Sequence, residues 1–388
     1  MGALYASGPM TRSHATEAAG LARSAAGKAV EDLERLGMLR THTPLAPGTP
    51  GRPSPKLVLC DSGAVVISVV LGREGIELAV VDLGRRILQR RSETFDTAAL
   101  APEDTLKRMA DAITRLAREI SVPCVGIGIS VPGLYSQQTG VAQALLPIGW
   151  RDVPMGAILA RLLPLDTPQV IAHDATLGAL AELHTGVGRG AQRLLFLTGQ
   201  RIGVGSALIV ADEHAGRSDH SLQAGHLIVN PAGPRCTCGA KGCLELFVDG
   251  RALARALGLP DAHPTADLHR SLLNPSSAAK KRLDGVMDHL EVGLISLVNT
   301  LAPDRVILSG LLSDLAALYP ERLSETLNLS VIAQISPVTL ARSTMKNHRL
   351  LGASELAFEP LLRDPEGLLG AMQLSKTSDK VNANVGCT

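Results

Sequence analysis

The sequence predicts an α/β protein preceded by a small helical domain, and three features of the chain support this fold class. From Lys56 onward, apolar runs typical of strands alternate with amphipathic helical patterns, as in α/β domains. Before Lys56, two short helical patterns meet at Gly20, where a turn is expected. The stretch from Leu39 to Lys56 holds five prolines and two glycines, which is typical of an extended wing and linker.

The N-terminal pattern is typical of a helix-turn-helix. One helix is expected from about Arg12 to Ala19, and a second carries apolar residues at helical spacing before Gly37 ends it. Residues 1 to 59 are mildly basic, with seven Lys or Arg and four acids. In such a unit the second helix enters the major groove, which nominates Arg23, Ser24 and Lys28 as DNA-binding residues. A helical hairpin without any nucleic-acid role gives the same local pattern.

The remaining elements follow from apolar periodicity. A helix is expected from about Glu103 to Ile120, and a longer one from Ser276 to Leu301, a type that packs in the core or at a subunit contact. Seven strands are expected, at Ala64–Leu71, Ile76–Asp82, Val125–Ser130, Gln169–Ala172, Arg193–Leu197, Ser206–Val210 and Arg305–Leu308.

Composition restricts the class of protein. A chain of 388 residues with 45% hydrophobic content suits two or three packed domains, and only 2% aromatics means cores of Leu, Val, Ile and Ala. Cys60, Cys124 and Cys387 are scattered and suggest no disulfide framework, which fits the reducing cytoplasm. We expect no signal peptide, because no basic start followed by an apolar run appears at the N-terminus. We expect no membrane helix either, because prolines and a Gln-Gln pair interrupt the uncharged stretch from Ser121 to Trp150.

One loop, residues 223–245, carries a metal-binding pattern. His226 precedes Cys236, Cys238 and Cys243 in a segment rich in Gly and Pro. Thiolates and a neutral imidazole are ligands that zinc prefers, and four protein ligands leave no position for a catalytic water. The pattern therefore predicts a structural Zn²⁺ held by these four residues. A buried histidine beside three ordinary thiols is the alternative interpretation.

The same loop resembles the signature of the ROK family, which groups bacterial sugar kinases with transcriptional repressors. That signature pairs Gly-His with Cys-x-Cys-Gly-x-x-Gly-Cys-Leu-Glu, and it is matched at Gly225, His226, Cys236, Cys238, Gly239, Gly242, Cys243, Leu244 and Glu245. The resemblance implies an actin-like, ribonuclease H-like domain of two similar α/β lobes with a cleft between them. The segment Gly51-Arg52-Pro53 resembles the winged helix-turn-helix of the family's repressors, which adds Arg52 to the DNA-binding candidates. The first helix of that three-helix unit is expected to be short or missing.

In the sugar kinases of this family, three loops hold the nucleotide phosphates through closely approaching backbone N–H groups. The first falls on residues 70–74, where Val70 replaces an acid and Glu74 would repel phosphate. The second falls on residues 199–203, where Gln200 and Arg201 replace Thr and Gly. The third is Ser309-Gly310 in place of Gly-Gly. We therefore expect no ATP binding and no kinase activity.

The resemblance also assigns a degenerate sugar site. An Asn-Asp pair supplies the family's general base, and here it is His173-Asp174, although Asp174 is equally placed to cap the next helix. Pro147 and Gln223 replace the family's Asn and Glu, so an unmodified hexose is expected to bind weakly or not at all. The expected effector-binding residues are Gly133, His173, Asp174, Gln223, His226 and Glu245.

The resulting hypothesis is a cytoplasmic, sequence-specific DNA-binding regulator, acting as a repressor. A winged helix-turn-helix is assigned to residues 1–58, the ROK domain to 59–371 and a disordered tail to 372–388. Expected partners are double-stranded operator DNA and a small-molecule effector that is sugar-like or of another kind, and the protein is expected to form a homodimer or homotetramer. Two alternatives stay open: a ROK sugar kinase, and a zinc-stapled interaction protein that does not bind DNA.

Overall fold

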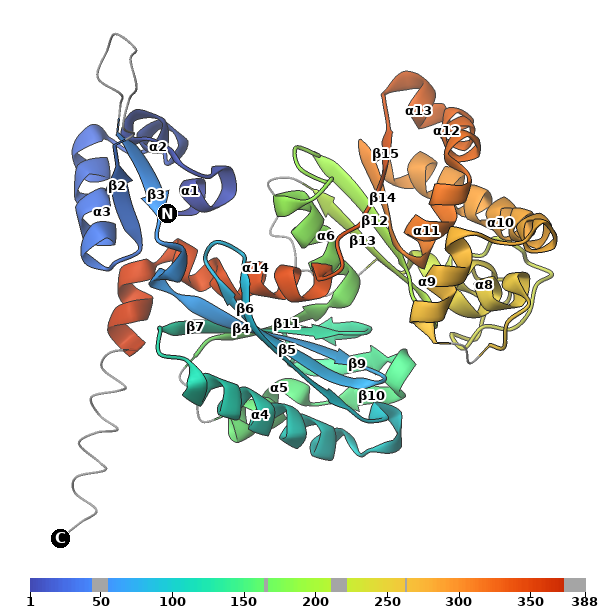
Figure 1. Ribbon diagram of the computed structural model, residues 1–388, viewed down its shortest axis with the longest axis horizontal. Coiled ribbons are helices and arrows are strands. Elements are labelled where there is room, and N and C mark those ends of the chain that lie inside the picture. Colours follow the sequence, from blue (N-terminus) through green and yellow to red (C-terminus); the bar gives the residue numbers. More distant parts are fainter. Residues whose placement is uncertain (44–54, 164–166, 211–221, 262–263, 373–388) are drawn as a thin grey trace. The chain divides into compact units, whose positions relative to one another are not determined.

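The computed structural model of the protein describes residues 1–43, 55–163, 167–210, 222–261 and 264–372. The chain divides into two compact units (Figure 1). Unit 1 comprises Met1–Ser130, Val153–Ile171 and the chain from Ala353 onward, whereas unit 2 comprises Val131–Asp152 and Ala172–Gly352. The elements are mixed helices and strands in both units, which confirms the predicted α/β class. Among the described residues, no helix combines the length and apolar character needed to cross a membrane.

Unit 1 begins with an N-terminal head, which we define as the described residues up to Leu59. The predicted helices are confirmed, and the first helix of the unit is present but short, with Leu4 and Tyr5 buried. Leu39 pairs with Leu59 in the antiparallel hairpin that forms the wing. The head contains helices α1 (Gly2–Ser7), α2 (Arg12–Ala18) and α3 (Arg23–Arg35), and strands β1 (Met10–Thr11), β2 (Leu39–His42) and β3 (Lys56–Leu59) in the order β1-β3-β2.

The rest of unit 1 is built on a five-stranded sheet in the order β11-β7-β4-β5-β6. Strands β4 and β7 are parallel, whereas β4, β5 and β6 form an antiparallel meander. Seven of the eight residues of β4 are buried, as expected where helices cover both faces of a sheet. The strands are β4 (Val65–Gly72), β5 (Gly75–Asp82), β6 (Ile87–Thr94), β7 (Cys124–Val131) and β11 (Gln169–His173).

Helices cover both faces of this sheet (Figure 1). Helices α4 (Pro102–Glu119) and α5 (Met155–Leu162) lie on one face, and α14 (His348–Arg363) lies on the other. The approach of α14 is close, because a Cβ built on Gly128 of β7 would stand only 2.1 Å from the carbonyl oxygen of Ala353. Glycine is therefore required at this position for α14 to reach the sheet.

Unit 2 contains a four-stranded sheet in the order β13-β12-β14-β15 and most of the helices. Strand β12 pairs antiparallel with β13 and parallel with β14, which pairs parallel with β15. A second, three-stranded sheet has the order β10-β9-β8. The strands are β8 (Leu134–Ser136), β9 (Val141–Leu145), β10 (Trp150–Val153), β12 (Arg193–Gly199), β13 (Val204–Val210), β14 (Arg305–Gly310) and β15 (Thr339–Arg342).

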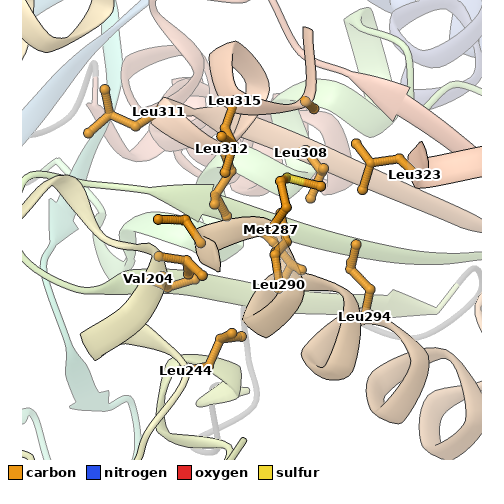
Figure 2. Packing of buried hydrophobic residues seen from close by; sticks show 14 of the residues in the cluster. Val204, Leu244, Met287, Leu290, Leu294, Leu308, Leu311, Leu312, Leu315 and Leu323 are labelled. Atoms are coloured by element: carbon orange, nitrogen blue, oxygen red, sulfur yellow. The ribbon is translucent and has the colours of Figure 1, made fainter. Parts of the chain in front are cut away.

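The core of unit 2 lies between the four-stranded sheet and its helices (Figure 2). Met287, Leu290 and Leu294 of α10 pack in this core together with Leu308 of β14. Leu244 also belongs to the core, so the loop that precedes it is anchored to α10. The helices are α6 (Asp174–Thr185), α7 (Glu245–Val248), α8 (Gly250–Leu257), α9 (Thr265–Leu273), α10 (Ser277–Leu301), α11 (Leu311–Leu318), α12 (Pro320–Asn328) and α13 (Val331–Ile335).

Candidate functional site

The metal loop, residues 223–245, is shaped by backbone hydrogen bonds. The N–H groups of Val229 and Asn230 both donate to the carbonyl oxygen of Gly242, at 2.9 and 3.3 Å. Gly242 has a φ of 71°, and a Cβ there would stand 1.6 Å from the carbonyl oxygen of Asn230. No other residue fits, so the turn that precedes Cys243 depends on glycine.

The loop brings together the four predicted metal ligands. The ligand atoms of His226, Cys236, Cys238 and Cys243 all lie within 4.8 Å of one another. His226 Nδ1 lies 3.6 Å from Cys236 Sγ, and the Sγ atoms of Cys238 and Cys243 are also 3.6 Å apart. Sulfur ligands about 2.3 Å from a tetrahedral zinc stand roughly 3.8 Å apart, so these spacings fit the ion.

The three thiols of this cluster differ in their pKa values when no metal is bound. Burial, followed by the neighbouring Cys238 and Cys236, raises the pKa of Cys243 to about 12. Burial likewise raises the pKa of Cys236, whereas hydrogen bonding from the backbone of Ala240 lowers the pKa of Cys238. Without a cation, Cys243 is therefore a neutral thiol at neutral pH. A bound divalent metal would offset the free-energy cost of deprotonating these thiols and would hold all three sulfurs as thiolates.

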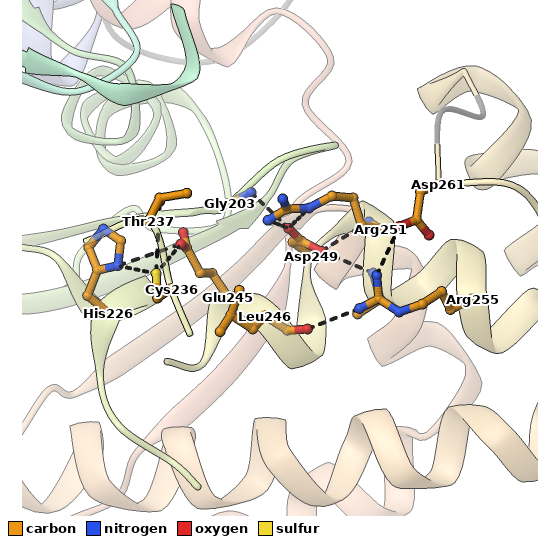
Figure 3. A network of polar contacts seen from close by, with 11 residues as sticks. Gly203, His226, Cys236, Thr237, Glu245, Leu246, Asp249, Arg251, Arg255 and Asp261 are labelled. Carbon is orange, nitrogen blue, oxygen red and sulfur yellow. Dashed lines mark hydrogen bonds and ion pairs between the residues drawn. The ribbon is translucent and has the colours of Figure 1, made fainter. Parts of the chain in front are cut away.

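Glu245 lies directly beside the ligands, at the start of α7 (Figure 3). The thiol of Cys236 donates to Glu245 Oε1 at 3.1 Å, and His226 Nδ1 lies 3.6 Å from the same oxygen. The other oxygen, Oε2, would stand 3.2 Å from a Cβ on Gly203. Glu245 therefore joins the metal loop to loop 199–203, the segment matched to the family's second phosphate loop.

Asp249 also contacts loop 199–203, and this role was not predicted from the sequence (Figure 3). Its buried carboxylate accepts from the N–H groups of Arg251 and Ala252, which caps α8, and from Gly203 N–H at 3.2 Å. Arg251 Nε donates to it as well, at 2.8 Å. An Asp at a helix start predicts only the cap, because the bond to Gly203 spans 46 residues.

Asp174, the predicted position of a degenerate base, is the first residue of α6. Both oxygens of the buried Asp174 carboxylate are engaged, since His173 Nε2 lies 3.2 Å from Oδ1 and Gln200 Nε2 donates to Oδ2 at 2.7 Å. Burial, opposed by the charge of Asp174, lowers the pKa of His173, so its imidazole is neutral. The capping alternative is wrong in detail, because the N-cap residue is His173 and makes no side-chain cap bond.

Both partners of Asp174 are among the residues that were identified from the sequence as departures from the family pattern, with His in place of Asn and Gln in place of Thr. From the sequence, Gln200 was identified only as the residue that replaces the Thr of the second phosphate loop. Its bond to Asp174 spans 26 residues and depends on how β12 and α6 pack in unit 2.

The other two effector candidates have different surroundings. Gly133 has a φ of 150°, and a Cβ there would stand 2.3 Å from the carbonyl oxygen of Ala144, so β9 fixes this turn. The side chain of Gln223 is exposed at the start of the short 3₁₀ turn Ala224–His226. Among the predicted effector residues, the structure thus pairs His173 with Asp174 and His226 with Glu245, and brings Glu245 against the loop that holds Gln200.

Three of the four DNA-binding candidates lie on α3, the third helix of the head. Arg23, Ser24 and Lys28 are all exposed in the N-terminal half of α3. The fourth candidate, Arg52, lies outside the described residues. The three described candidates share one accessible face of the helix, as the predicted recognition role requires.

Together these features define a class: an α/β protein of the sugar-kinase type, carrying a Cys/His metal loop and an N-terminal winged helix-turn-helix. The protein family that matches the chain is the ROK family, over residues 66–359. Because this match covers most of the chain, the protein belongs to the ROK family.

Individual relatives fall into two groups. The xylose repressor of Bacillus subtilis is 23% identical over 365 residues, which cover 91% of this chain and 92% of the repressor. The glucokinase of Thermotoga maritima is 28% identical and is covered over 97% of its length by only 80% of this chain. A solved ROK family transcriptional regulator, described as a homologue of the E. coli MLC protein, has a TM-score of 0.72 at 18% identity, covering 91% of this chain and 92% of that one. This last similarity shows the fold.

Proposed function

We propose that the protein is a sequence-specific DNA-binding transcriptional regulator, acting as a repressor, whose kinase-type domain senses a small molecule. The observation that carries this proposal is the exposed, basic N-terminal half of α3 in a winged helix-turn-helix. The xylose repressor similarity supports it, because that similarity extends over nearly the whole of both chains.

The proposed effector site centres on loop 199–203 and its neighbours, which include His173, Asp174, His226 and Glu245. A structural Zn²⁺ held by His226 and the three loop cysteines would fix the position of Glu245. The effector is a sugar or another small molecule, and it must bind one arrangement of the DNA-binding heads more tightly than the other to change DNA affinity. A homodimer or homotetramer would present two heads to a symmetric operator.

Capture of genomic DNA tests the proposal. Fragmented genomic DNA is incubated with the zinc-loaded protein at near-physiological salt, where non-specific binding is weakened more than specific binding. We expect a few fragments that share a two-fold motif, and we expect the double variant Arg23→Ala/Lys28→Ala to lose them. Arg118→Gln, which removes an exposed charge from α4, is the matched control and should retain them. No enrichment by the unaltered chain would reject DNA binding and favour an interaction protein.

The glucokinase similarity requires that sugar phosphorylation be tested as well. We propose that the chain lacks this activity, and the state of Asp174 supports the proposal. A general base must lie within hydrogen-bond reach of the substrate hydroxyl, whereas the buried Asp174 carboxylate already accepts from Gln200 Nε2 and lies 3.2 Å from His173 Nε2. A coupled assay over a panel of hexoses and amino sugars should give no ADP release above the sugar-free control. Sugar-dependent release of ADP would contradict this assignment.

A further inference from the structure

The face of α3 that carries the proposed DNA contacts holds one more cation, contributed by another helix. Arg12 is the first residue of α2 and is exposed. A Cβ built on Gly27 of α3 would stand 3.0 Å from Arg12 Nη2, and apart from its chain neighbours and the backbone of its own helix, no other atom of the described residues comes within 4 Å of it. The guanidinium of Arg12 therefore lies against α3 at the one position of that helix where a side chain is missing.

Gly27 belongs to the same part of the helix as the predicted contacts. Arg23 and Ser24 precede it by four and three residues, which places them beside it on the helix surface, and Lys28 follows it directly. Three cations, from Arg12, Arg23 and Lys28, are thus gathered over the N-terminal half of α3. The acids of this helix, Glu31, Asp32 and Glu34, all lie in its C-terminal half.

This distribution of charge does not stabilise the helix. A helix N-terminus favours acidic side chains, yet the first turn of α3 has none, and its N-cap residue Ala22 offers no side-chain acceptor. Across the described residues, no carboxylate forms an ion pair with Arg12, Arg23 or Lys28. Arg35, at the other end of the same helix, is paired with both Asp32 and Glu366. The unpaired cations therefore occupy only the end of α3 that faces the proposed DNA.

We propose that Arg12 contacts a DNA phosphate and that Gly27 positions it for this contact. The inference rests on the proposed DNA-binding function. In helix-turn-helix proteins the helix that precedes the recognition helix crosses the DNA backbone, which is where the start of α2 places Arg12. A guanidinium is suited to a phosphate because its donors form a planar fork. Because Gly27 has no side chain, the Arg12 guanidinium can lie close to the surface of α3, within reach of the DNA strand that borders the major groove.

Arg12→Gln tests the contact itself. We expect binding to a mixed-sequence DNA duplex to weaken on the order of tenfold, since one charge-assisted bond is lost. We also expect the slope of log affinity against log salt to fall by about one, uniformly across DNA sequences. Arg118→Gln on α4 is the charge-matched control and should leave the slope unchanged. An unchanged slope for Arg12→Gln, or a loss confined to the captured operator fragments, would overturn a phosphate contact.

Gly27→Ala tests the positioning role. The added methyl requires the far end of Arg12 to move by a few tenths of an ångström, so affinity should fall less than with Arg12→Gln. The thermal midpoint should rise, because alanine favours a helix interior more than glycine does. Gly285→Ala in α10, where a Cβ meets nothing within 4 Å, should raise the midpoint without changing DNA affinity.

The two substitutions should not be additive. The variant carrying both Arg12→Gln and Gly27→Ala should bind DNA no more weakly than Arg12→Gln alone, because the alanine acts only through Arg12. Additive losses, or a lowered thermal midpoint for Gly27→Ala, would overturn the positioning role. Failure of the unaltered chain to bind any duplex at low salt would instead overturn the DNA-binding function, and the inference with it.

Discussion

Replacing Glu355 by alanine is expected to release the N-terminal head from α14. Arg85 Nε and Nη2 donate to the two Glu355 oxygens at 2.6 and 3.2 Å, and only 3% of the Glu355 side chain is exposed. Arg85 Nη1 also donates to the carbonyl oxygen of Tyr5 in α1, and the guanidinium lies 3.9 Å from the centre of the Tyr5 ring. The substitution leaves a largely buried cation unpaired, at a cost of about 3 kcal/mol.

Hydrogen exchange of α1, together with urea unfolding, measures this effect. We expect faster exchange in α1 for Glu355→Ala, while exchange in α10 of unit 2 is unchanged. The control is Asp111→Ala, which breaks an exposed pair with Lys107 on α4 and should change neither measurement. Glu355→Ala behaving like Asp111→Ala would show that the pair does not hold the head.

The pKa values of this contact agree with a stable ion pair. Burial alone would lower the pKa of Arg85, but the hydrogen bonds and charge of Glu355 outweigh burial and raise it. Burial, with the charge of Glu355, raises the pKa of Tyr5 well above its ordinary value. Arg85 therefore stays charged and Tyr5 neutral throughout the physiological pH range. Arg85 and Tyr5 therefore add no pH dependence to head release near neutrality.

Replacing Cys243 by serine is expected to remove the proposed zinc and destabilise unit 2. Cys243 is fully buried, and its neighbour Leu244 packs against α10 at Gly293. Structural zinc sites bind with apparent free energies on the order of 10 kcal/mol, comparable to the stability of a whole domain. We expect zinc content to fall from one ion per chain towards none, with a lower thermal midpoint. A chelator should lower the midpoint of the unaltered chain but not that of Cys243→Ser.

Cys60→Ser and Cys124→Ser provide the controls, because both cysteines lie in unit 1, outside the metal loop. Each should retain full zinc content and the response to a chelator. Retention of zinc by Cys243→Ser, or an unaltered chain that purifies without zinc and shows no response to a chelator, would contradict the assignment of the metal site.

The strands that the sequence predicted are those whose own residues are buried. Val65–Gly72 and Arg305–Gly310 are nearly continuous apolar runs, so their burial is evident locally. Strand β6 was missed because its sequence, ILQRRSET, is mostly exposed and lies at the edge of its sheet. Its stability comes from pairing with β5 and from cross-strand contacts such as that between Arg90 and Glu77, which no local pattern reveals.

In the candidate site, too, the sequence predicted contacts within one short segment but not contacts between segments far apart in the chain. The predicted metal ligands lie within one short loop, so their spacing alone predicted a cluster that the structure brings together. The pairing of Gln200 with Asp174 and the reach of Asp249 to Gly203 join separate elements of unit 2. Local sequence patterns do not encode such contacts, because they depend on how the sheet and helices pack. The role proposed for Gly27 could not be predicted from the sequence either, because it depends on the position of Arg12.

The order in which the chain leaves the ribosome sets when the head can be fixed in place. Unit 1 is discontinuous, and its sheet receives α14 only after all of unit 2 has been translated. Domains generally fold as units during synthesis, so the inserted unit 2 has its complete sequence before unit 1 does. Until Ala353 and Glu355 emerge, β7 lacks the helix that covers it and Arg85 lacks its partner. During synthesis the head therefore lacks its contact with α14, and this contact can form only after Glu355 has emerged.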